Sequence, residues 1–141
     1  HLSPAVRACA QEELGGIERV HLIEPVDVEE MHNLMARCHM VMTDSGGLQE
    51  EAPALGKPVL VLRRETERPE AVEAGTVRVI GTEKEVISAE AEELLLEGER
   101  YHSMARAVNP YGDGFACRRI VDDLLYFLGE RAQPAEDFSS K

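Results

Sequence analysis

Basic residues are scarce in this sequence, and their scarcity narrows the classes of ligand that the chain can bind. Lysine and arginine together number 15, against 27 aspartates and glutamates, so the net charge is −12. A nucleic-acid-binding surface needs a dominant positive field, which a chain of this composition does not provide. An anionic ligand would have to be held locally, by backbone N–H groups and a few arginines.

Cysteines and long apolar runs are also few. The three cysteines, Cys9, Cys38 and Cys117, are odd in number and lack C-x-x-C spacing, which predicts reduced cytoplasmic thiols. No histidine or cysteine spacing suits a metal site. No apolar run approaches the roughly 20 residues that span a bilayer, and no signal peptide is visible. These features predict a cytoplasmic protein without a membrane partner.

What the chain does contain is enough apolar sequence for one globular domain. Hydrophobic residues make up 43% of its 141 residues. The first residue is His1 and not methionine, so we expect a piece of a longer protein. Residues 131–141 are predicted to be a polar tail.

Short apolar segments alternate with helix-like segments along the chain. Strands are predicted at residues 19–23, 39–43, 58–62 and 76–80. Helices are predicted at residues 5–14, 28–37, 47–55, 69–74, 84–96, 100–107 and 115–128. This alternation favours an α/β fold, a Rossmann-like parallel sheet with helices on both faces. Ligands of such sheets bind beyond the carboxyl ends of the strands, where the loops at 24–26, 44–46 and 63–68 are expected to lie.

The loop after the second predicted strand is the most informative segment, with the sequence TDSGGLQEE at residues 43–51. It places Ser45, Gly46 and Gly47 at a helix N-terminus, where unpaired N–H groups and the helix dipole favour an anion. Paired glycines let a phosphate approach the backbone. Glu50 and Glu51 follow within about one helical turn, where a carboxylate can reach sugar hydroxyls. These residues suit a nucleoside diphosphate, although Ser and Gly also serve as an ordinary helix cap.

Three stretches, in this order, resemble the non-hydrolysing UDP-N-acetylglucosamine 2-epimerases. They are TDSGGLQEEAP at residues 43–53, TERPE at 66–70 followed by AGT at 74–76, and NPYGDG at 109–114. The resemblance runs from His1 to about Leu128. It implies that residues 1–130 are part of the carboxyl-terminal, UDP-binding domain of a glycosyltransferase-like GT-B architecture, in which two Rossmann-like halves enclose the active site.

The resemblance also implies an activity for the complete protein. Members of the family are isomerases that interconvert UDP-GlcNAc and UDP-ManNAc for cell-envelope polysaccharides, and they need neither a nicotinamide nor a metal. The C2 proton is removed and UDP is expelled, and UDP then adds back with C2 inverted. The main catalytic carboxylates lie in the amino-terminal half, so no catalytic residue is expected in this chain, which alone should be inactive. The full-length protein is expected to be a homodimer.

Particular residues match those that bind UDP in the family. The resemblance implies that Ser45, Gly46 and Gly47 hold the diphosphate and that Glu51 accepts hydrogen bonds from the ribose. Glu50 is expected to be a solvated helix residue. Arg68 is expected to face the UDP charge, because its guanidinium suits phosphate, although it can instead pair structurally with nearby glutamates, Glu67 and Glu70.

Other residues also match positions of the family, and some of them have a second interpretation. Val26, by its backbone, and Met31, by its side chain, match the positions that contact uracil, but Met31 also fits a core methionine. His1 matches a histidine of the cleft where a second UDP-GlcNAc binds and activates relatives. Residues 109–114 are predicted to be a turn or hinge. Two central strands of the family's sheet precede His1, which predicts a gap between the first two strands of this chain.

Two further functions remain open from the sequence. One is a stand-alone UDP-sugar-binding or regulatory module without turnover. The other is half of a glycosyltransferase, against which residues 66–70 argue because they resemble the epimerases more.

Overall fold

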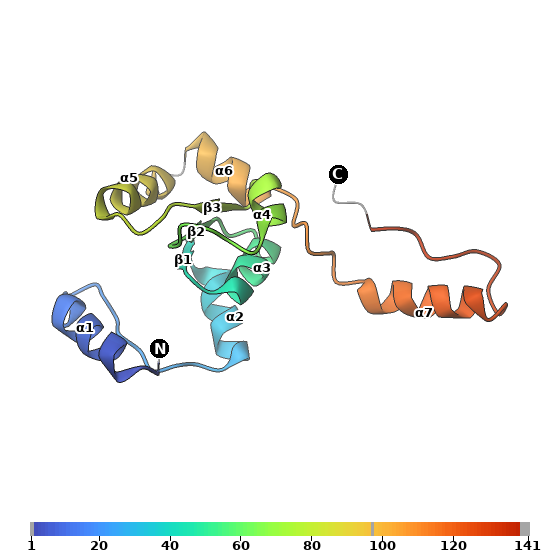
Figure 1. Cartoon of the computed structure of the whole chain (residues 1–141), viewed down its shortest axis with the longest axis horizontal. Coiled ribbons are helices and arrows are strands. Elements are labelled where there is room, and N and C mark those ends of the chain that lie inside the picture. Colours follow the sequence, from blue (N-terminus) through green and yellow to red (C-terminus); the bar gives the residue numbers. More distant parts are fainter. Residues whose placement is uncertain (1, 97, 139–141) are drawn as a thin grey trace. The chain divides into compact units, whose positions relative to one another are not determined.

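A computed structural model describes residues 2–96 and 98–138 (Figure 1). The chain divides into two compact units, His1–Leu34 and Met35–Lys141. No helix in the described part of the chain is long and apolar enough to cross a bilayer.

The first unit contains α1 (Pro4–Leu14) and most of α2 (Val28–Arg37). Arg7 on α1 donates from Nη1 to Glu24 Oε2 at 2.9 Å, which ties the helix to the segment that follows it. Asp27 caps α2, because its Oδ1 accepts a hydrogen bond from the backbone N–H of Glu30 at 2.8 Å.

The prediction of a strand at residues 19–23 was wrong. In the described chain this segment takes no part in the sheet, and the Val20 N–H bonds to the Ile17 carbonyl in a turn at 3.0 Å. The apolar pattern is present, but a strand exists only where a neighbouring strand supplies hydrogen-bond partners. Apolar alternation alone cannot show whether that neighbour is available.

The second unit is built on a three-stranded parallel sheet in the order β1-β2-β3. Its strands are β1 (Val41–Thr43), β2 (Val59–Val61) and β3 (Val77–Val79), with Val41 opposite Val59 and Val59 opposite Val77. Its helices are α3 (Gly46–Ala54), α4 (Pro69–Glu73), α5 (Lys84–Leu95), α6 (Glu99–Arg106) and α7 (Ala116–Phe127). The prediction of a parallel α/β fold is confirmed, with every expected element except the first strand.

Helices cover both faces of this sheet, with α5 and α6 on one side and α3 on the other (Figure 1). Leu60 points toward α5 and α6, where it packs in a cluster with Ile80, Leu94 and Met104. Because side chains alternate along a strand, Val59 and Val61 point to the opposite face. All three residues of β2 are fully buried, as expected of a strand covered on both faces.

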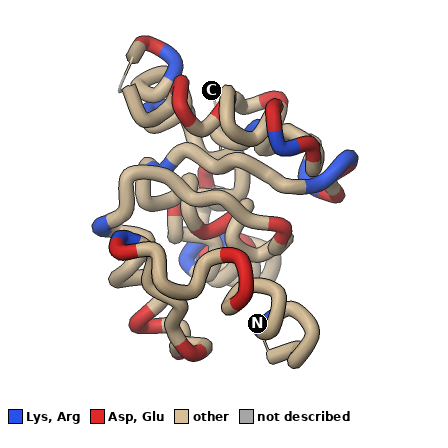
Figure 2. The backbone as a smooth tube through the Cα atoms, turned by 90° about the vertical axis from the view of Figure 1, so that its left-hand side faces the viewer, with Lys and Arg blue, Asp and Glu red and all other residues tan. Residues whose placement is uncertain are grey.

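Ion pairs join the elements of this unit on its outer side. Figure 2 shows acidic and basic residues interspersed along the backbone. Glu90 on α5 accepts hydrogen bonds from Arg78 of β3 at 2.6 Å and from Arg100 of α6 at 2.9 Å. One carboxylate thus links α5 to both the sheet and α6.

Candidate functional site

The turn between β1 and α3 has the backbone geometry of an anion site. Ser45 is extended, with φ −76° and ψ 129°, and α3 begins at Gly46. The first N–H groups of a helix have no partner within it, so those of Gly46 and Gly47, the first residues of α3, can hydrogen-bond an anion. The Ser45 hydroxyl makes no capping hydrogen bond within the described residues. This observation weighs against the reading of Ser45 as an ordinary cap.

Glu51 and Ser45 flank Gly47. A Cβ atom added to Gly47 would lie 3.6 Å from Glu51 Oε1 and 3.9 Å from Ser45 Oγ. The carboxylate and the hydroxyl therefore both lie beside Gly47 at the start of α3, and the Glu51 side chain is exposed. A carboxylate in this place can accept hydrogen bonds from a vicinal diol while the helix start holds a phosphate.

Arg68 approaches the same turn from the loop after β2. A Cβ atom added to Gly46 would lie 3.9 Å from Arg68 Nη2. Two predicted elements, the phosphate turn and the arginine loop, thus meet at the carboxyl ends of β1 and β2, as expected for a parallel sheet. Ser45, Gly46, Gly47, Glu51 and Arg68 lie together.

The partner of Arg68 differs from the predicted ones. Its Nε donates to Glu50, and its Nη1 donates to the backbone carbonyl of Glu67 at 3.2 Å. The Glu67 carboxylate pairs instead with Arg63, at 3.1 Å. Glu50 is consequently more than a solvated helix residue, because its half-exposed carboxylate also holds the guanidinium in place. The hydrogen bond and charge of Glu50 raise the pKa of Arg68 above its ordinary value.

Sequence reasoning missed Gln49, which is fully buried between these loops. Its Oε1 accepts a hydrogen bond from Thr66 Oγ1 at 2.6 Å, and its Nε2 donates to the Ser45 carbonyl at 3.2 Å. The available signal was its spacing, because Gln49 lies three and four residues before Ala52 and Pro53 and so shares their buried helix face.

The loop at residues 109–114 packs beside the same cluster. Burial raises the pKa of the Tyr111 phenol, and the negative charges of Glu70 and Glu50 raise it further, while Arg68 lowers it. The Tyr111 hydroxyl is buried and has no hydrogen-bond partner among the described residues. The predicted turn or hinge role of this loop stays a prediction.

The candidates for uracil contact lie in the other compact unit. Val26, in the extended segment before α2, and Met31, within α2, are both half-buried and belong to His1–Leu34. Their roles stay predictions. His1 lies outside the described residues.

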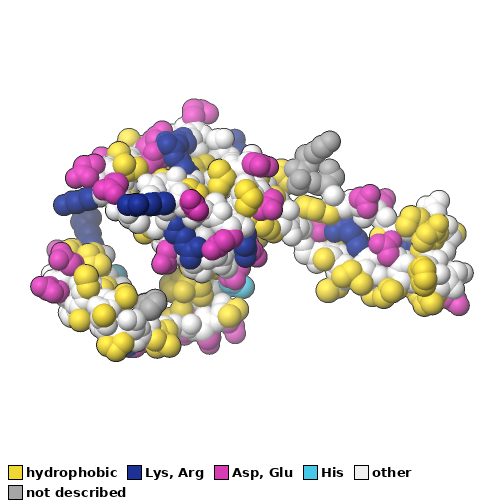
Figure 3. Space-filling model, in the orientation of Figure 1, with side chains coloured by type: hydrophobic (Ala, Val, Ile, Leu, Met, Phe, Trp, Pro, Cys, Tyr) yellow, Lys and Arg dark blue, Asp and Glu magenta, His cyan; other side chains and the backbone are white. Residues whose placement is uncertain are grey.

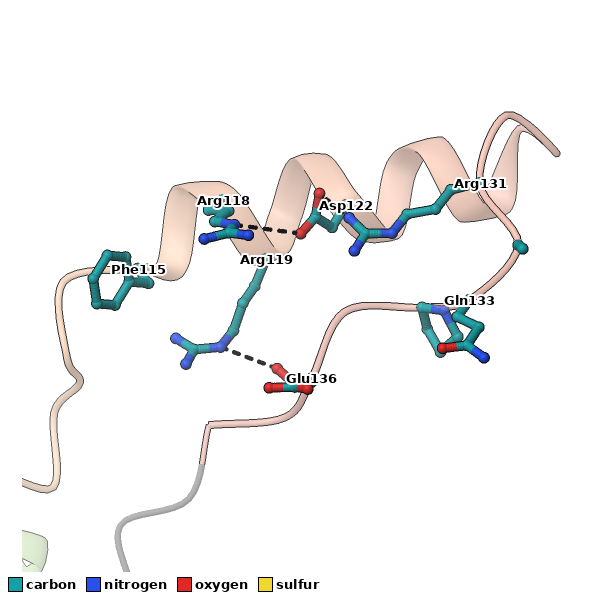
Figure 4. A pocket seen from close by; sticks show the side chains of 9 residues that line it. Phe115, Arg118, Arg119, Asp122, Arg131, Gln133 and Glu136 are labelled. Atoms are coloured by element: carbon teal, nitrogen blue, oxygen red, sulfur yellow. Dashed lines mark hydrogen bonds and ion pairs between the residues drawn. The ribbon is translucent and has the colours of Figure 1, made fainter.

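The hollow beside α7 is a different feature. It measures about 520 Å³ and is bordered by α7 and the segment after it (Figure 4). Arg119 is committed there to Asp113, at 2.6 Å, and to the Glu136 carbonyl, at 3.0 Å, while Arg118 and Arg131 pair with Asp122. Arg119 has its Nε and both Nη atoms engaged, whereas the described residues engage only Nε and Nη1 of Arg68. This hollow therefore offers an anion less than the β1–α3 turn does. Within residues 2–96 and 98–138, no group of acidic, histidine and cysteine side chains is arranged to hold a metal ion.

A helix N-terminus at the carboxyl end of a parallel strand, with an arginine beside it, is typical of Rossmann-like nucleotide-binding units. Comparison with known proteins gives the family. The family model described as UDP-N-acetylglucosamine 2-epimerase matches residues 1–125. The chain therefore belongs to the UDP-N-acetylglucosamine 2-epimerase family.

Individual relatives and solved structures support the same family. The UDP-N-acetylglucosamine 2-epimerase of Bacillus subtilis is 53% identical over 141 residues, which are 100% of this chain and 37% of that protein. The S. aureus MnaA–UDP co-structure superposes with a TM-score of 0.89 at 51% identity, over 99% of this chain and 38% of that one. The UDP-GlcNAc-bound enzyme of Neisseria meningitidis gives 0.82 at 50% identity, over 89% and 34%. The chain thus spans little more than a third of the length of these relatives.

Proposed function

We propose that this chain is the UDP-binding portion of an epimerase that interconverts UDP-GlcNAc and UDP-ManNAc. The supporting observation is the meeting of Ser45, Gly46, Gly47, Glu51 and Arg68 at the carboxyl ends of β1 and β2. Relatives of matching sequence include one structure with UDP and one with UDP-GlcNAc. The stand-alone module has no such support, because the relatives compared above are epimerases and are much longer.

The proposed reaction gives this portion a clear chemical task. A base outside this chain takes the C2 proton, the bond from C1 to the phosphate oxygen breaks, and UDP leaves with that electron pair. The glycal then takes UDP back at C1 and a proton on the other face of C2. As UDP departs, negative charge grows on its terminal phosphate, where the α3 N-terminus and Arg68 stabilise it. Glu51 binds the ribose and so keeps the phosphate in position at the α3 N-terminus, while Val26 and Met31 contact the uracil.

Three further statements belong to this proposal. The complete protein acts in the cytoplasm, which is consistent with three cysteines that form no disulfide. It supplies cell-envelope polysaccharide synthesis. It works as a homodimer, with His1 in the cleft between the two halves of each protomer and residues 131–141 as a tail.

The test is UDP affinity with a matched pair of glutamate variants. Glu51→Ala should weaken UDP binding by about tenfold, because it removes an acceptor for the ribose hydroxyls. Glu92→Ala, on the exposed side of α5, should leave the affinity unchanged. Titration calorimetry measures both. Equal affinities for the two variants would contradict the ribose assignment.

A further inference from the structure

Gln49 occupies an unusual position for a polar side chain. It lies on the inward face of α3 and is fully buried, whereas Glu50 and Glu51 beside it reach the surface. Burial of an amide is costly unless its polar atoms are hydrogen-bonded. The two bonds that Gln49 makes are therefore the reason that an amide is tolerated there.

Those two bonds connect the two loops of the binding site. The Gln49 amide donates to the carbonyl of Ser45, in the phosphate turn, at 3.2 Å, and accepts from Thr66, in the arginine loop, at 2.6 Å. The Gln49 amide offers a donor and an acceptor on one rigid plane, whereas an ionised glutamate has no donor and methionine has neither group in that geometry, so neither can replace both bonds.

The connection continues at each end. The Thr66 hydroxyl also accepts a hydrogen bond from the backbone N–H of Arg68, at 3.1 Å. At the other end, the N–H of Ser45 donates to Thr43 Oγ1 at 3.0 Å. Both backbone groups of Ser45 are thus fixed by side chains, and Arg68 is fixed through its backbone by Thr66 and through its guanidinium by Glu50.

We infer that Gln49 and Thr66 form a relay that holds the phosphate turn and Arg68 in one binding geometry before the ligand arrives. This inference rests on the proposed function. Gln49 touches no ligand and is a positioning residue. Because the two loops are already ordered before UDP binds, binding does not carry the entropic cost of ordering them, and preorganisation of this kind strengthens binding.

Near-isosteric variants test the relay by calorimetry with UDP. Thr66→Val removes the hydroxyl and should weaken UDP binding by about tenfold, while Thr66→Ser keeps the hydroxyl and should restore the wild-type affinity. Gln49→Met should lose a similar factor. The double variant should lose about tenfold as well, and not the hundredfold product, because both changes break one network. Gln11→Met and Thr82→Val, at exposed positions, are the matched controls.

A second ligand separates positioning from general damage. Uridine lacks the diphosphate, so its affinity, measured by NMR titration, should be the same in Thr66→Val and in the wild type. Equal losses for uridine and UDP, additive losses in the double variant, or a Thr66→Ser variant as weak as Thr66→Val would overturn the relay. The two Thr66 variants decide the matter if Gln49→Met does not fold. A wild-type chain that binds no UDP would instead overturn the proposed function, and the relay with it.

Discussion

The sheet region at residues 41–106 and helix α7 contain similar apolar residues, but the sheet region buries them and α7 does not. In the sheet region Val59, Leu60 and Val61 are fully buried. No residue of α7, all of which is described, is buried, and Phe127 is 85% exposed. Figure 3 shows hydrophobic side chains gathered over α7. The sheet region therefore has a hydrophobic core of its own, and α7 contributes almost no buried side chain to that core.

The largest expected effect is on stability, from matched truncations in the two regions. Leu60→Ala should lower the free energy of unfolding by about 2–5 kcal/mol, because it opens a cavity among Ile80, Leu94 and Met104. Phe127→Ala should change it by less than about 0.5 kcal/mol, because the ring is already in solvent. Urea denaturation followed by circular dichroism measures both. Equal losses would show that α7 belongs to the same cooperative core.

The next effect is on ligand binding, from one arginine in each region. Arg68→Ala should weaken UDP binding by about tenfold, because a charge-assisted contact to phosphate is lost. Arg119→Ala should leave UDP binding unchanged, because Asp113 and the Glu136 carbonyl engage all three of its guanidinium nitrogens, whereas the described residues engage only Nε and Nη1 of Arg68. Calorimetry on both variants makes the comparison. A loss of UDP affinity in Arg119→Ala alone would indicate that the phosphate binds in the hollow beside α7.

Much of this contrast could be predicted from the sequence, and the reasons for the failures are physical. Pro58 to Leu62 identified β2 because a short apolar run between turns has few other structures. Residues 19–23 have a similar pattern but form no strand, since pairing depends on a neighbour and not on the run itself. Likewise, the glycine turn at 45–47 was visible as a motif, while the roles of Gln49 and Glu50 depend on which loop folds over α3.

The smallest expected effect concerns pH and the anchor of α7. Hydrogen bonds from Arg119 and from the Phe115 N–H hold the pKa of the Asp113 carboxyl well below its ordinary value. A depressed folded-state pKa stabilises the folded form above the unfolded value of about 3.9, and that contribution is lost as the pH falls from there through the folded-state pKa. The anchor should therefore persist at pH 4 and loosen only in stronger acid. A carbon-detected NMR titration of the Asp113 carboxyl measures this, and Arg119→Ala should return its midpoint toward the ordinary value.

The comparison can be settled most directly by amide NMR of this chain during a titration with UDP. We expect the largest shifts at Gly46 and Gly47, whose N–H groups begin α3, with smaller shifts at Arg68 and none along α7. Shifts concentrated around Arg118 and Arg119, with the Gly46 and Gly47 signals unmoved, would contradict the assignment of the phosphate site to the β1–α3 turn.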